Sequence, residues 1–336
     1  MRAMQLTKTA PVETAPLQPV EMPLPEPGLN ELRIKVLACG VCHTDIHEIE
    51  GDIKPPHLPL IVGHEIVGVV DKLGAGVKEP KIGTRVGIPW LASTCGKCHF
   101  CKTSRENLCE EIKFTGFHTD GGYAQYTICR AGFCYPLSEN LAIANLAPLL
   151  CAGVIGYRSL KRADVQPETN VGLYGFGASA HICLQILKHW HCWVAVFTRT
   201  KSHQEHAREL GADWVGTAKE KPPYRLASAI IFAPAGELVP LALSNLDKGA
   251  TLALAGIHMS PIPEMDYSLI YHERKICSVA NSTRQDVIEL LSLAEEIPLR
   301  TTVTTFPLEQ ANQALLAVKK SEINGAAVLL NEIVRA

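Results

Sequence analysis

The sequence lacks the features that would direct a chain to a membrane, to a nucleic acid or into secretion. Its 336 residues carry a net charge of −2, so no strong field favours nucleic acid or an anionic membrane. No N-terminal segment joins basic residues to a long apolar core, which argues against a signal peptide and favours the cytoplasm. One long uncharged run, residues 140–157, contains Pro148 and is shorter than the ~20 apolar residues of a membrane span. We interpret that run as a buried element.

The chain also contains no internal repeat and no low-complexity tract. Its length suits two domains, and a composition of 47% hydrophobic and 20% charged residues is ordinary for a globular protein. In roughly the first 150 residues, short apolar runs separated by glycine and proline predict a mainly β domain with many loops. The expected strands there are 32–37, 61–70, 85–88 and 123–128.

The pattern changes near residue 150, where strand-like and helix-like runs begin to alternate. Such alternation predicts βαβ units around a parallel sheet, hence an α/β fold. The expected strands are 170–174, 193–197, 229–232 and 251–255, and the expected helices are 178–189 and 204–210. Two further helical patterns, 287–296 and 308–320, precede a last strand at 326–330.

Twelve cysteines without a secretion signal suggest metal ligands or catalytic groups rather than disulfides. Four of them, Cys95, Cys98, Cys101 and Cys109, follow C-x2-C-x2-C-x7-C. Four thiolates at this spacing can surround one tetrahedral Zn²⁺ in a closed, structural site. The first three spacings also match an iron–sulfur run, but that run ends C-x3-C-P and this one does not. Nearby glutamates argue against a zinc module that binds nucleic acid.

A second group of reactive side chains lies in the stretch 40–47, GVCHTDIH. Cys42 can bind zinc as a thiolate, and the Thr44 hydroxyl can donate and accept a proton. Asp45 can orient a ligand from behind, while His47 can exchange a proton with water near neutral pH.

Two later residues would complete an open metal site with Cys42. His64 lies in the sequence GHE, and Cys151 lies in the apolar run near residue 150. A set of two cysteines and one histidine leaves the fourth zinc position for water or substrate, as in catalytic sites. Glu65 and Asp45 are placed to support the ligands, or one of them could take the fourth position. Cys39 forms a C-x-x-C with Cys42, but the intervening Gly-Val does not suggest a redox pair.

A glycine-rich turn, Gly175-Phe176-Gly177-Ala178-Ser179, follows an expected strand and opens an expected helix. It matches the dinucleotide fingerprint G-x-G-x-x-A, in which the first glycine makes the tight turn and the second admits a pyrophosphate. The strand–turn–helix context is the one that this motif requires. About 20 residues further on, where NAD-binding domains place an acidic residue, the sequence reads Thr198-Arg199-Thr200-Lys201.

Together these motifs resemble the zinc-dependent medium-chain alcohol dehydrogenases over nearly the whole chain. The resemblance implies a GroES-like, mainly β catalytic domain at 1–150 with a structural zinc lobe at 91–111. It also implies a Rossmann domain with a doubly wound parallel sheet at 151–283, and a segment, 284–336, that completes the catalytic domain. Relatives of this architecture commonly form homo-oligomers, so a dimer or tetramer is expected.

The resemblance also assigns roles to residues. It implies two zinc ions per chain, with the catalytic ion on Cys42, His64 and Cys151. Thr44 and His47 would form the proton relay through a cofactor ribose hydroxyl, with Asp45 and Glu65 in support. Trp90 would line the substrate pocket beside Thr44, and His43 would lie near the cofactor pyrophosphate.

The resulting expectation is an NAD(P)-dependent oxidoreductase that transfers a hydride between a small alcohol or aldehyde and the nicotinamide. A zinc-free quinone or enoyl reductase of the same fold is an alternative, as is a nucleotide-binding relative without turnover. The missing carboxylate and the added charges of Arg199 and Lys201 favour NADP over NAD. The competing interpretation is that both are solvated loop charges and that NAD binds weakly.

Overall fold

The computed structural model describes residues 1–297 and 299–331, which form two compact units. The first unit contains Met1–Cys151, Asn281–Glu295 and the chain from Thr301 onward; the second contains Ala152–Ala280 and Glu296–Arg300. This division differs slightly from the expected boundaries. Cys151 belongs to the first unit rather than the second, and a short stretch after helix α8 is counted with the second unit.

The first unit is built around one long strand, β3 (Glu31–Val41). One half of β3 pairs with β9 and the other with β18, while β5 runs along most of its length. Its main sheet has the order β10-β6-β5-β3-β18-β17, with β9 also on β3. The bounds are β5 Glu65–Leu73, β6 Arg85–Ile88, β9 Tyr126–Arg130, β10 Tyr135–Pro136, β17 Val303–Pro307 and β18 Ala326–Leu330.

Smaller sheets flank this main sheet. One has the order β2-β1-β4 and the other is the pair β7-β8. Their bounds are β1 Arg2–Leu6, β2 Leu17–Glu21, β4 Leu60–Ile61, β7 Leu91–Ser93 and β8 Lys113–Phe114. Buried aliphatic side chains from β1, β3, β5 and the C-terminal helix α9 (Ala311–Lys319) form one core. The C-terminal segment therefore belongs to the first unit through both its strand β18 and its helix α9.

Two expected strands of this unit are interrupted or displaced. The run 61–70 is divided into β4 and β5 because Gly63 has φ = +98°, a conformation that no regular strand contains. The expected strand 123–128 begins only at Tyr126. Tyr123 instead makes separate backbone bonds, donating to Val62 O and accepting from Met4 N. These irregular segments are the ones that carry His64 and Tyr123.

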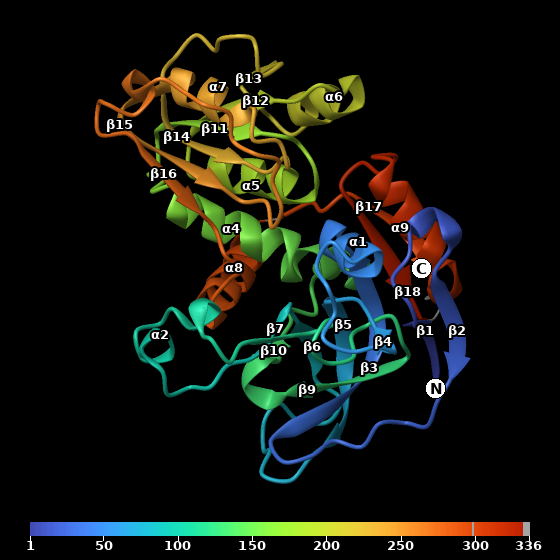
Figure 1. Ribbon diagram of the computed structural model, residues 1–336. Coiled ribbons are helices and arrows are strands. Elements are labelled where there is room, and N and C mark those ends of the chain that lie inside the picture. The colour runs from blue at the N-terminus through green and yellow to red at the C-terminus, as the bar shows by residue number, and fades with distance from the viewer. Residues whose placement is uncertain (298, 332–336) are drawn as a thin grey trace. The chain divides into compact units, whose positions relative to one another are not determined.

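The second unit contains a parallel sheet of order β13-β12-β11-β14-β15-β16. Figure 1 shows helices α4 and α5 on one side of this sheet and α7 on the other. The strand order reverses between β11 and β14, which is the switch point where open α/β sheets bind ligands. The bounds are β11 Asn170–Tyr174, β12 Trp193–Phe197, β13 Trp214–Gly216, β14 Leu226–Ile231, β15 Leu246–Leu254 and β16 Lys275–Ser278.

The helices complete the expected α/β fold. Lys201 opens α6, so the helix expected at 204–210 starts earlier and the residue is not in a loop. The α-helical bounds are α1 His43–Glu50, α2 His99–Lys102, α3 Ile143–Leu146, α4 Ala152–Arg162, α5 Ala178–His189, α6 Lys201–Glu209, α7 Leu238–Asn245 and α8 Arg284–Glu296. The 3-10 turns are η1 Val12–Thr14, η2 Glu106–Leu108, η3 Ala131–Phe133, η4 Ala147–Leu150, η5 Tyr267–Leu269 and η6 Leu308–Gln310.

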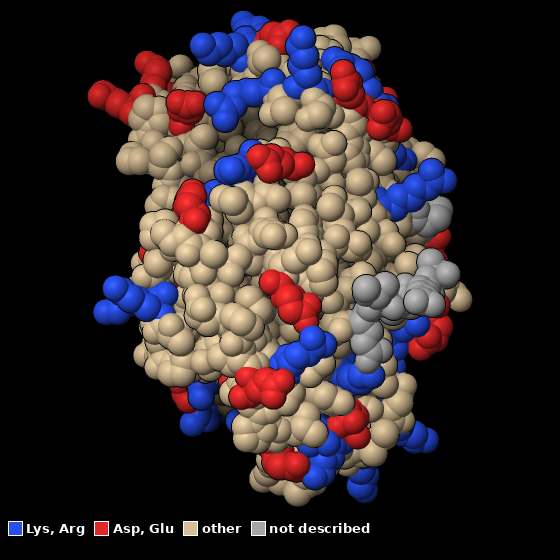
Figure 2. Space-filling view, turned by 90° about the vertical axis from the view of Figure 1, so that its right-hand side faces the viewer, with Lys and Arg blue, Asp and Glu red and all other residues tan. Residues whose placement is uncertain are grey.

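No single helix in the described chain is long and apolar enough to cross a membrane. One bent pair, Ile143–Leu150 with Ala152–Arg162, passes that test by length and composition. Several of its side chains, including Leu146, Leu149 and Leu160, are buried. On the face drawn in Figure 2, Lys and Arg are interspersed with Asp and Glu.

The strand break at Gly63 gives the first prediction. An added Cβ would run into the ring of Tyr123, and the positive φ disfavours any L side chain. We expect Gly63→Ala to destabilise the fold by at least about 1–2 kcal/mol, the usual cost of left-handed backbone. Denaturant unfolding measures this. Gly132→Ala in η3 is the control, since a Cβ there meets nothing within 4 Å. Equal unfolding midpoints for the two variants would contradict the prediction.

Candidate functional site

Helix α1 begins with a cap that also fixes a candidate metal ligand. Cys42 is the N-cap residue, and its Sγ accepts from Thr44 N at 3.5 Å. In return, the backbone N–H of Cys42 donates to Asp45 Oδ2 at 2.8 Å. This reciprocal pair is a capping box in which a cysteine takes the usual place of serine or threonine. The cap therefore fixes the position of the Cys42 sulfur.

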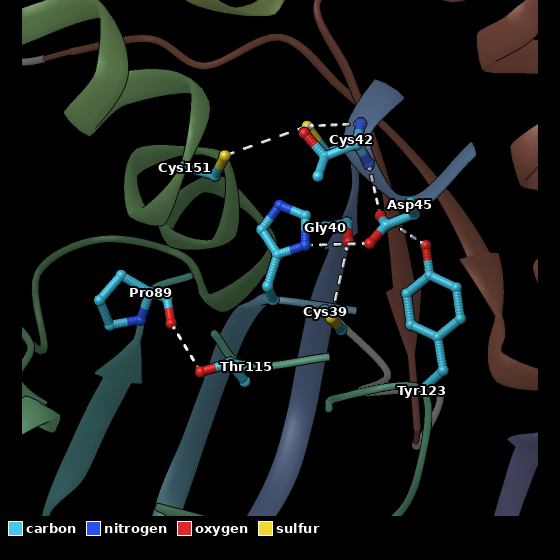
Figure 3. Close-up of polar contacts among 10 residues, drawn as sticks. Cys39, Gly40, Cys42, Asp45, Pro89, Thr115, Tyr123 and Cys151 are labelled. Atoms are coloured by element: carbon cyan, nitrogen blue, oxygen red, sulfur yellow. Dashed lines mark hydrogen bonds and ion pairs between the residues drawn. The ribbon is translucent and has the colours of Figure 1, made fainter. Parts of the chain in front are cut away.

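Asp45 extends this arrangement to two distant residues. Its Oδ1 lies 3.0 Å from His64 Nδ1, and its Oδ2 accepts from the Tyr123 hydroxyl at 3.0 Å. Asp45 and His64 are both fully buried. Figure 3 shows the Asp45 carboxylate between the Cys42 backbone and Tyr123. The contact with Nδ1 turns the other ring nitrogen of His64 away from Asp45.

The expected ligands of the open metal site converge in the first unit. Potential ligand atoms of Cys42, His64, Glu65 and Cys151 all lie within 4.8 Å of one another. The Cys42 and Cys151 sulfurs face each other at 3.9 Å and form no disulfide (Figure 3). His64 Nε2 is buried without a hydrogen-bond partner among the described residues. Two thiols and an unused imidazole nitrogen fit zinc.

The electrostatics of the site also suit a cation. A hydrogen bond with Cys151, helped by His64, holds the pKa of Cys42 well below its usual value despite burial. The same contact and burial raise the pKa of Cys151. Burial by itself would lower the pKa of His64, but the charge of Asp45 and the contacts with Asp45 and the Cys42 sulfur raise it. The site therefore concentrates negative charge around one imidazole.

Glu65 and Cys39 differ in their relation to the ligand set. Glu65 opens β5 and packs so closely on Gly40 of β3 that an added Cβ would collide with its carboxylate. Glu65 belongs to the ligand set, as expected for a group able to take a fourth position. Cys39 is buried away from that set, and its Sγ lies 3.5 Å from Gly40 O. Burial raises the pKa of Cys39 well above its usual value, which argues against a redox role.

Both residues expected to bind the substrate, Thr44 and Trp90, lie near this centre. The Thr44 hydroxyl is 3.7 Å from Cys42 Sγ. The Trp90 ring stacks on Phe114 at 4.1 Å, and its centroid is 5.8 Å from that of His64.

His47, three positions after Thr44 on α1, is partly exposed. Its Nδ1 lies 2.9 Å from Asp52 Oδ2. Asp52 can fix the tautomer of His47, and no sequence motif pointed to it. His43 is exposed at the start of α1.

The four cysteine side chains of the lobe also lie close together. Ligand atoms of Cys95, Cys98, Cys101 and Cys109 lie within 4.8 Å of one another. The Cys98 and Cys101 sulfurs are 3.5 Å apart, and those of Cys95 and Cys101 are 3.9 Å apart. Backbone N–H groups of Lys97 and Cys98 lower the pKa of Cys95 to about 7, while burial raises that of Cys109 to about 11. The set fits a closed structural zinc site.

A buried carboxylate ties this lobe to helix α8. Glu106 Oε1 accepts from the backbone N of Arg284 at 2.9 Å, at the first residue of α8. The Arg284 side chain lies over the Phe133 ring, with 5.4 Å between guanidinium carbon and ring centroid. The lobe is therefore anchored to an element almost 180 positions away in the sequence. No local pattern indicated this contact.

The glycine-rich turn lies at the switch point of the second unit. Gly175 follows β11 with φ = +88° and donates to Phe197 O at 2.8 Å, which makes the expected tight turn. Gly177 is the N-cap of α5, has no side-chain cap, and an added Cβ would meet nothing within 4 Å. No side chain therefore crowds Gly177 at the start of α5, next to Ala178 and Ser179. Phe176 is buried and contacts the His206 ring edge-on.

The segment after β12 carries the expected cofactor residues. Thr198 is buried, and its backbone N donates to Gly216 O at 2.9 Å. Arg199, Thr200 and Lys201 are exposed, and neither cation makes an ion pair within the described chain. Thr200 is the N-cap of α6, so both cations lie at or next to a helix N-terminus. Such a terminus with two cations suits an anion.

Comparison with known proteins identifies the class. The profile of the alcohol dehydrogenase GroES-like domain matches residues 28–139. The chain is 43% identical to the probable alcohol dehydrogenase AdhA of Mycobacterium tuberculosis (strain CDC 1551 / Oshkosh), over 98% of this chain and 97% of that protein. It is 35% identical to an alcohol dehydrogenase of Geobacillus stearothermophilus, over 94% and 96%. The fold and these relatives define an oxidoreductase of alcohol dehydrogenase type, as expected.

Solved structures of alcohol dehydrogenases also resemble the structure of this chain. A cobalt- and zinc-bound thermostable alcohol dehydrogenase from Pyrobaculum aerophilum superposes with a TM-score of 0.90 at 25% identity, over 98% of this chain and 99% of that one. A cinnamyl alcohol dehydrogenase from Sorghum bicolor gives 0.89 at 25% identity, over 98% and 97%. The chain belongs to the medium-chain alcohol dehydrogenase family, and the expected GroES-like and Rossmann fold is confirmed.

Proposed function

We propose that this chain oxidises a small alcohol, or reduces the matching aldehyde, using a nicotinamide cofactor and a zinc ion on Cys42, His64 and Cys151. The observation that carries the proposal is the convergence of these three residues around an unused imidazole nitrogen. The cobalt- and zinc-bound relative supports the choice of metal. Concentrations of substrate and cofactor would set the direction of the reaction in the cell.

Zinc in this position would polarise the oxygen of the alcohol or aldehyde and lower the pKa of the alcohol. The protein supplies the surrounding groups. Asp45 keeps the His64 ring in position through Nδ1. Thr44 offers a hydroxyl that can accept the proton of the substrate, and His47 exchanges a proton with solvent from its partly exposed place beside Asp52.

The cofactor would bind at the second unit through groups already described. The N-terminus of α5 after Gly177 suits a pyrophosphate. We assign the 2′-phosphate of NADP to Arg199 and Lys201, with Thr198 and Thr200 as further donors, and retain NAD as a weaker alternative. The exposed edge strand β16, with Ile276 on its surface, is consistent with a homo-oligomer that pairs through this unit.

The metal assignment predicts about two zinc ions per chain, measurable by elemental analysis of the purified protein. Cys151→Ser should lose one ion and the activity but keep its unfolding midpoint. Cys98→Ser should lose the other ion and unfold at lower denaturant, because binding of structural zinc contributes to folding. Near-normal activity in Cys151→Ser would exclude Cys151 as the third ligand.

The relay predicts a pH-dependent defect. His47→Gln should slow alcohol oxidation mainly at low pH, where hydroxide is too scarce to replace the general base. General bases typically contribute ~10²–10⁴-fold, and the partly exposed position of His47 favours the lower end. The pH dependence of kcat/KM measures the effect. Asp52→Asn serves as the comparison, because it keeps the imidazole and removes only its carboxylate partner. An unchanged profile in His47→Gln would remove His47 from the mechanism.

Cofactor choice gives the fourth prediction. The sequence has no carboxylate at Thr198 to hold the adenosine ribose, whereas Arg199 can grip a phosphate through two parallel hydrogen bonds. We expect a higher kcat/KM with NADP than with NAD, and a raised KM for NADP in Arg199→Ala. Arg208→Ala, on the same helix as Lys201 but at its other end, is the control. A clear preference for NAD, or an unchanged KM in Arg199→Ala, would refute the assignment.

A further inference from the structure

His181 is a buried histidine on α5 that the proposed reaction does not use. Its side chain is 1% exposed, and its Nδ1 lies 3.4 Å from Gly177 O, at the start of the same helix. A carbonyl oxygen can only accept, so this contact assigns the ring proton to Nδ1 and leaves Nε2 as an acceptor. Nε2 is buried without a hydrogen-bond partner among the described residues. Because an unpaired buried acceptor is costly, a group that can donate to it is expected nearby.

The ring that lies beside His181 is that of His206, on the neighbouring helix α6. The two ring centroids are 5.9 Å apart, with 60° between the ring planes. His206 also meets the ring of Phe176 edge-on at 5.8 Å, and Phe176 lies between the two glycines of the nucleotide turn. His206 therefore adjoins the turn to which we assign the cofactor pyrophosphate. It also lies on the helix that Lys201, assigned to the 2′-phosphate, opens.

Burial disfavours a charge on each histidine of this cluster. Burial lowers the pKa of His181 to about 4, and His206 acts in the same direction. Burial also lowers the pKa of His206, which Glu209 opposes, and the pKa of His203, on which His206 acts as well. Strand β13, Trp214–Gly216, packs against α6 and contains no titratable residue. The charged groups around His206 are therefore few, and a new charge nearby would act on it strongly.

A bound cofactor would bring such a charge. The pyrophosphate at the start of α5 and a 2′-phosphate at Arg199 and Lys201 are anions, and a nearby anion favours the protonated form of a histidine. Protonated His206 carries an N–H on both ring nitrogens. One of them can donate to Nε2 of His181, directly or through one water, while the positive charge faces the phosphates. His181 remains neutral in this pair, so its acceptor is kept.

We propose that cofactor binding draws a proton from solvent onto His206, where His181 accepts its hydrogen bond, so that NADP binds more tightly as the pH falls. The proposal rests on the proposed function, which places the phosphates at the turn and at α6. It makes His206 a positioning residue for charge rather than a phosphate ligand. The competing interpretation is that the three histidines only pack α6 against α5 and stay neutral whether or not cofactor is bound.

The experiment measures the Kd of NADP for the zinc-loaded enzyme at about pH 6 and about pH 7.5, on either side of the usual histidine range. The 2′-phosphate itself titrates near pH ~6, but it is the same in every variant. The ratio of the two Kd values should therefore be compared between proteins. We expect wild type to favour the lower pH about threefold to tenfold more than His206→Gln, which cannot take up the proton.

His189→Gln is the matched control. His189 lies at the other end of α5, where its side chain is 39% exposed and pairs with Glu296. This variant should keep the wild-type ratio. Calorimetry in two buffers of different ionisation enthalpy counts the protons that binding takes up. Wild type and His189→Gln should take up more protons per NADP than His206→Gln.

A spectroscopic readout separates proton coupling from packing. In protein labelled with ¹³C-histidine, the ring resonance missing from His206→Gln identifies His206. Its titration midpoint should rise when NADP is bound, whereas that of His189 should not move. His181→Leu removes the acceptor and should reduce this rise. Should His181→Leu not fold, the comparison of wild type with His206→Gln still tests the proposal.

The outcomes distinguish the proton coupling from the reaction. Equal Kd ratios in wild type and His206→Gln, or a His206 titration that NADP does not move, would overturn the coupling and leave the proposed function intact. A loss of the same size in His189→Gln would also overturn it, since the effect would then be general. Absence of NADP binding at both pH values would overturn the assignment of NADP and, with it, this inference.

Discussion

The Asp45 carboxylate is the contact on which the candidate active site depends. It accepts from Cys42 N at 2.8 Å and from the Tyr123 hydroxyl at 3.0 Å, and it pairs with His64 Nδ1 at 3.0 Å. A fully buried carboxylate is tolerable only when it is bonded in this way. Three segments, the start of α1, the break before β5 and the approach to β9, are thereby fixed to one side chain. Because Nδ1 is occupied, His64 can offer only Nε2 to a metal.

The register of the main sheet brings the two nearest ligands together. Gly40 of β3 lies opposite Glu65 of β5 in an antiparallel pair. Cys42 therefore comes two residues after that pair and His64 one residue before it, so both leave the sheet at the same point. Gly40 is required there because the Glu65 carboxylate fills the space of a Cβ. A rigid platform of paired strands positions the ligands more exactly than a loop could, while Cys151 arrives separately from the end of η4.

The features that could be predicted from the sequence are those encoded by the spacing of nearby residues. The four-cysteine lobe, the stretches around Cys42 and His64, and the strand–turn–helix at Gly175 all depend on residues a few positions apart. Contacts between distant segments carry no such signal, which is why Tyr123, and Glu106 as the anchor of α8, could not be foreseen. Glu48 is an intermediate case. Its spacing from Thr44 indicates a shared helix face, but only the structure shows that its carboxyl group is fully buried.

The acidic residues around the candidate metal centre differ in which groups stabilise their buried carboxylates. The Asp45 carboxylate is satisfied within the protein, and Glu65 lies with the ligand set, where a cation would neutralise its charge. Glu48 lies in the same field of negative charge but outside that set, so a cation bound to the ligands would reduce the cost of burying its carboxyl group.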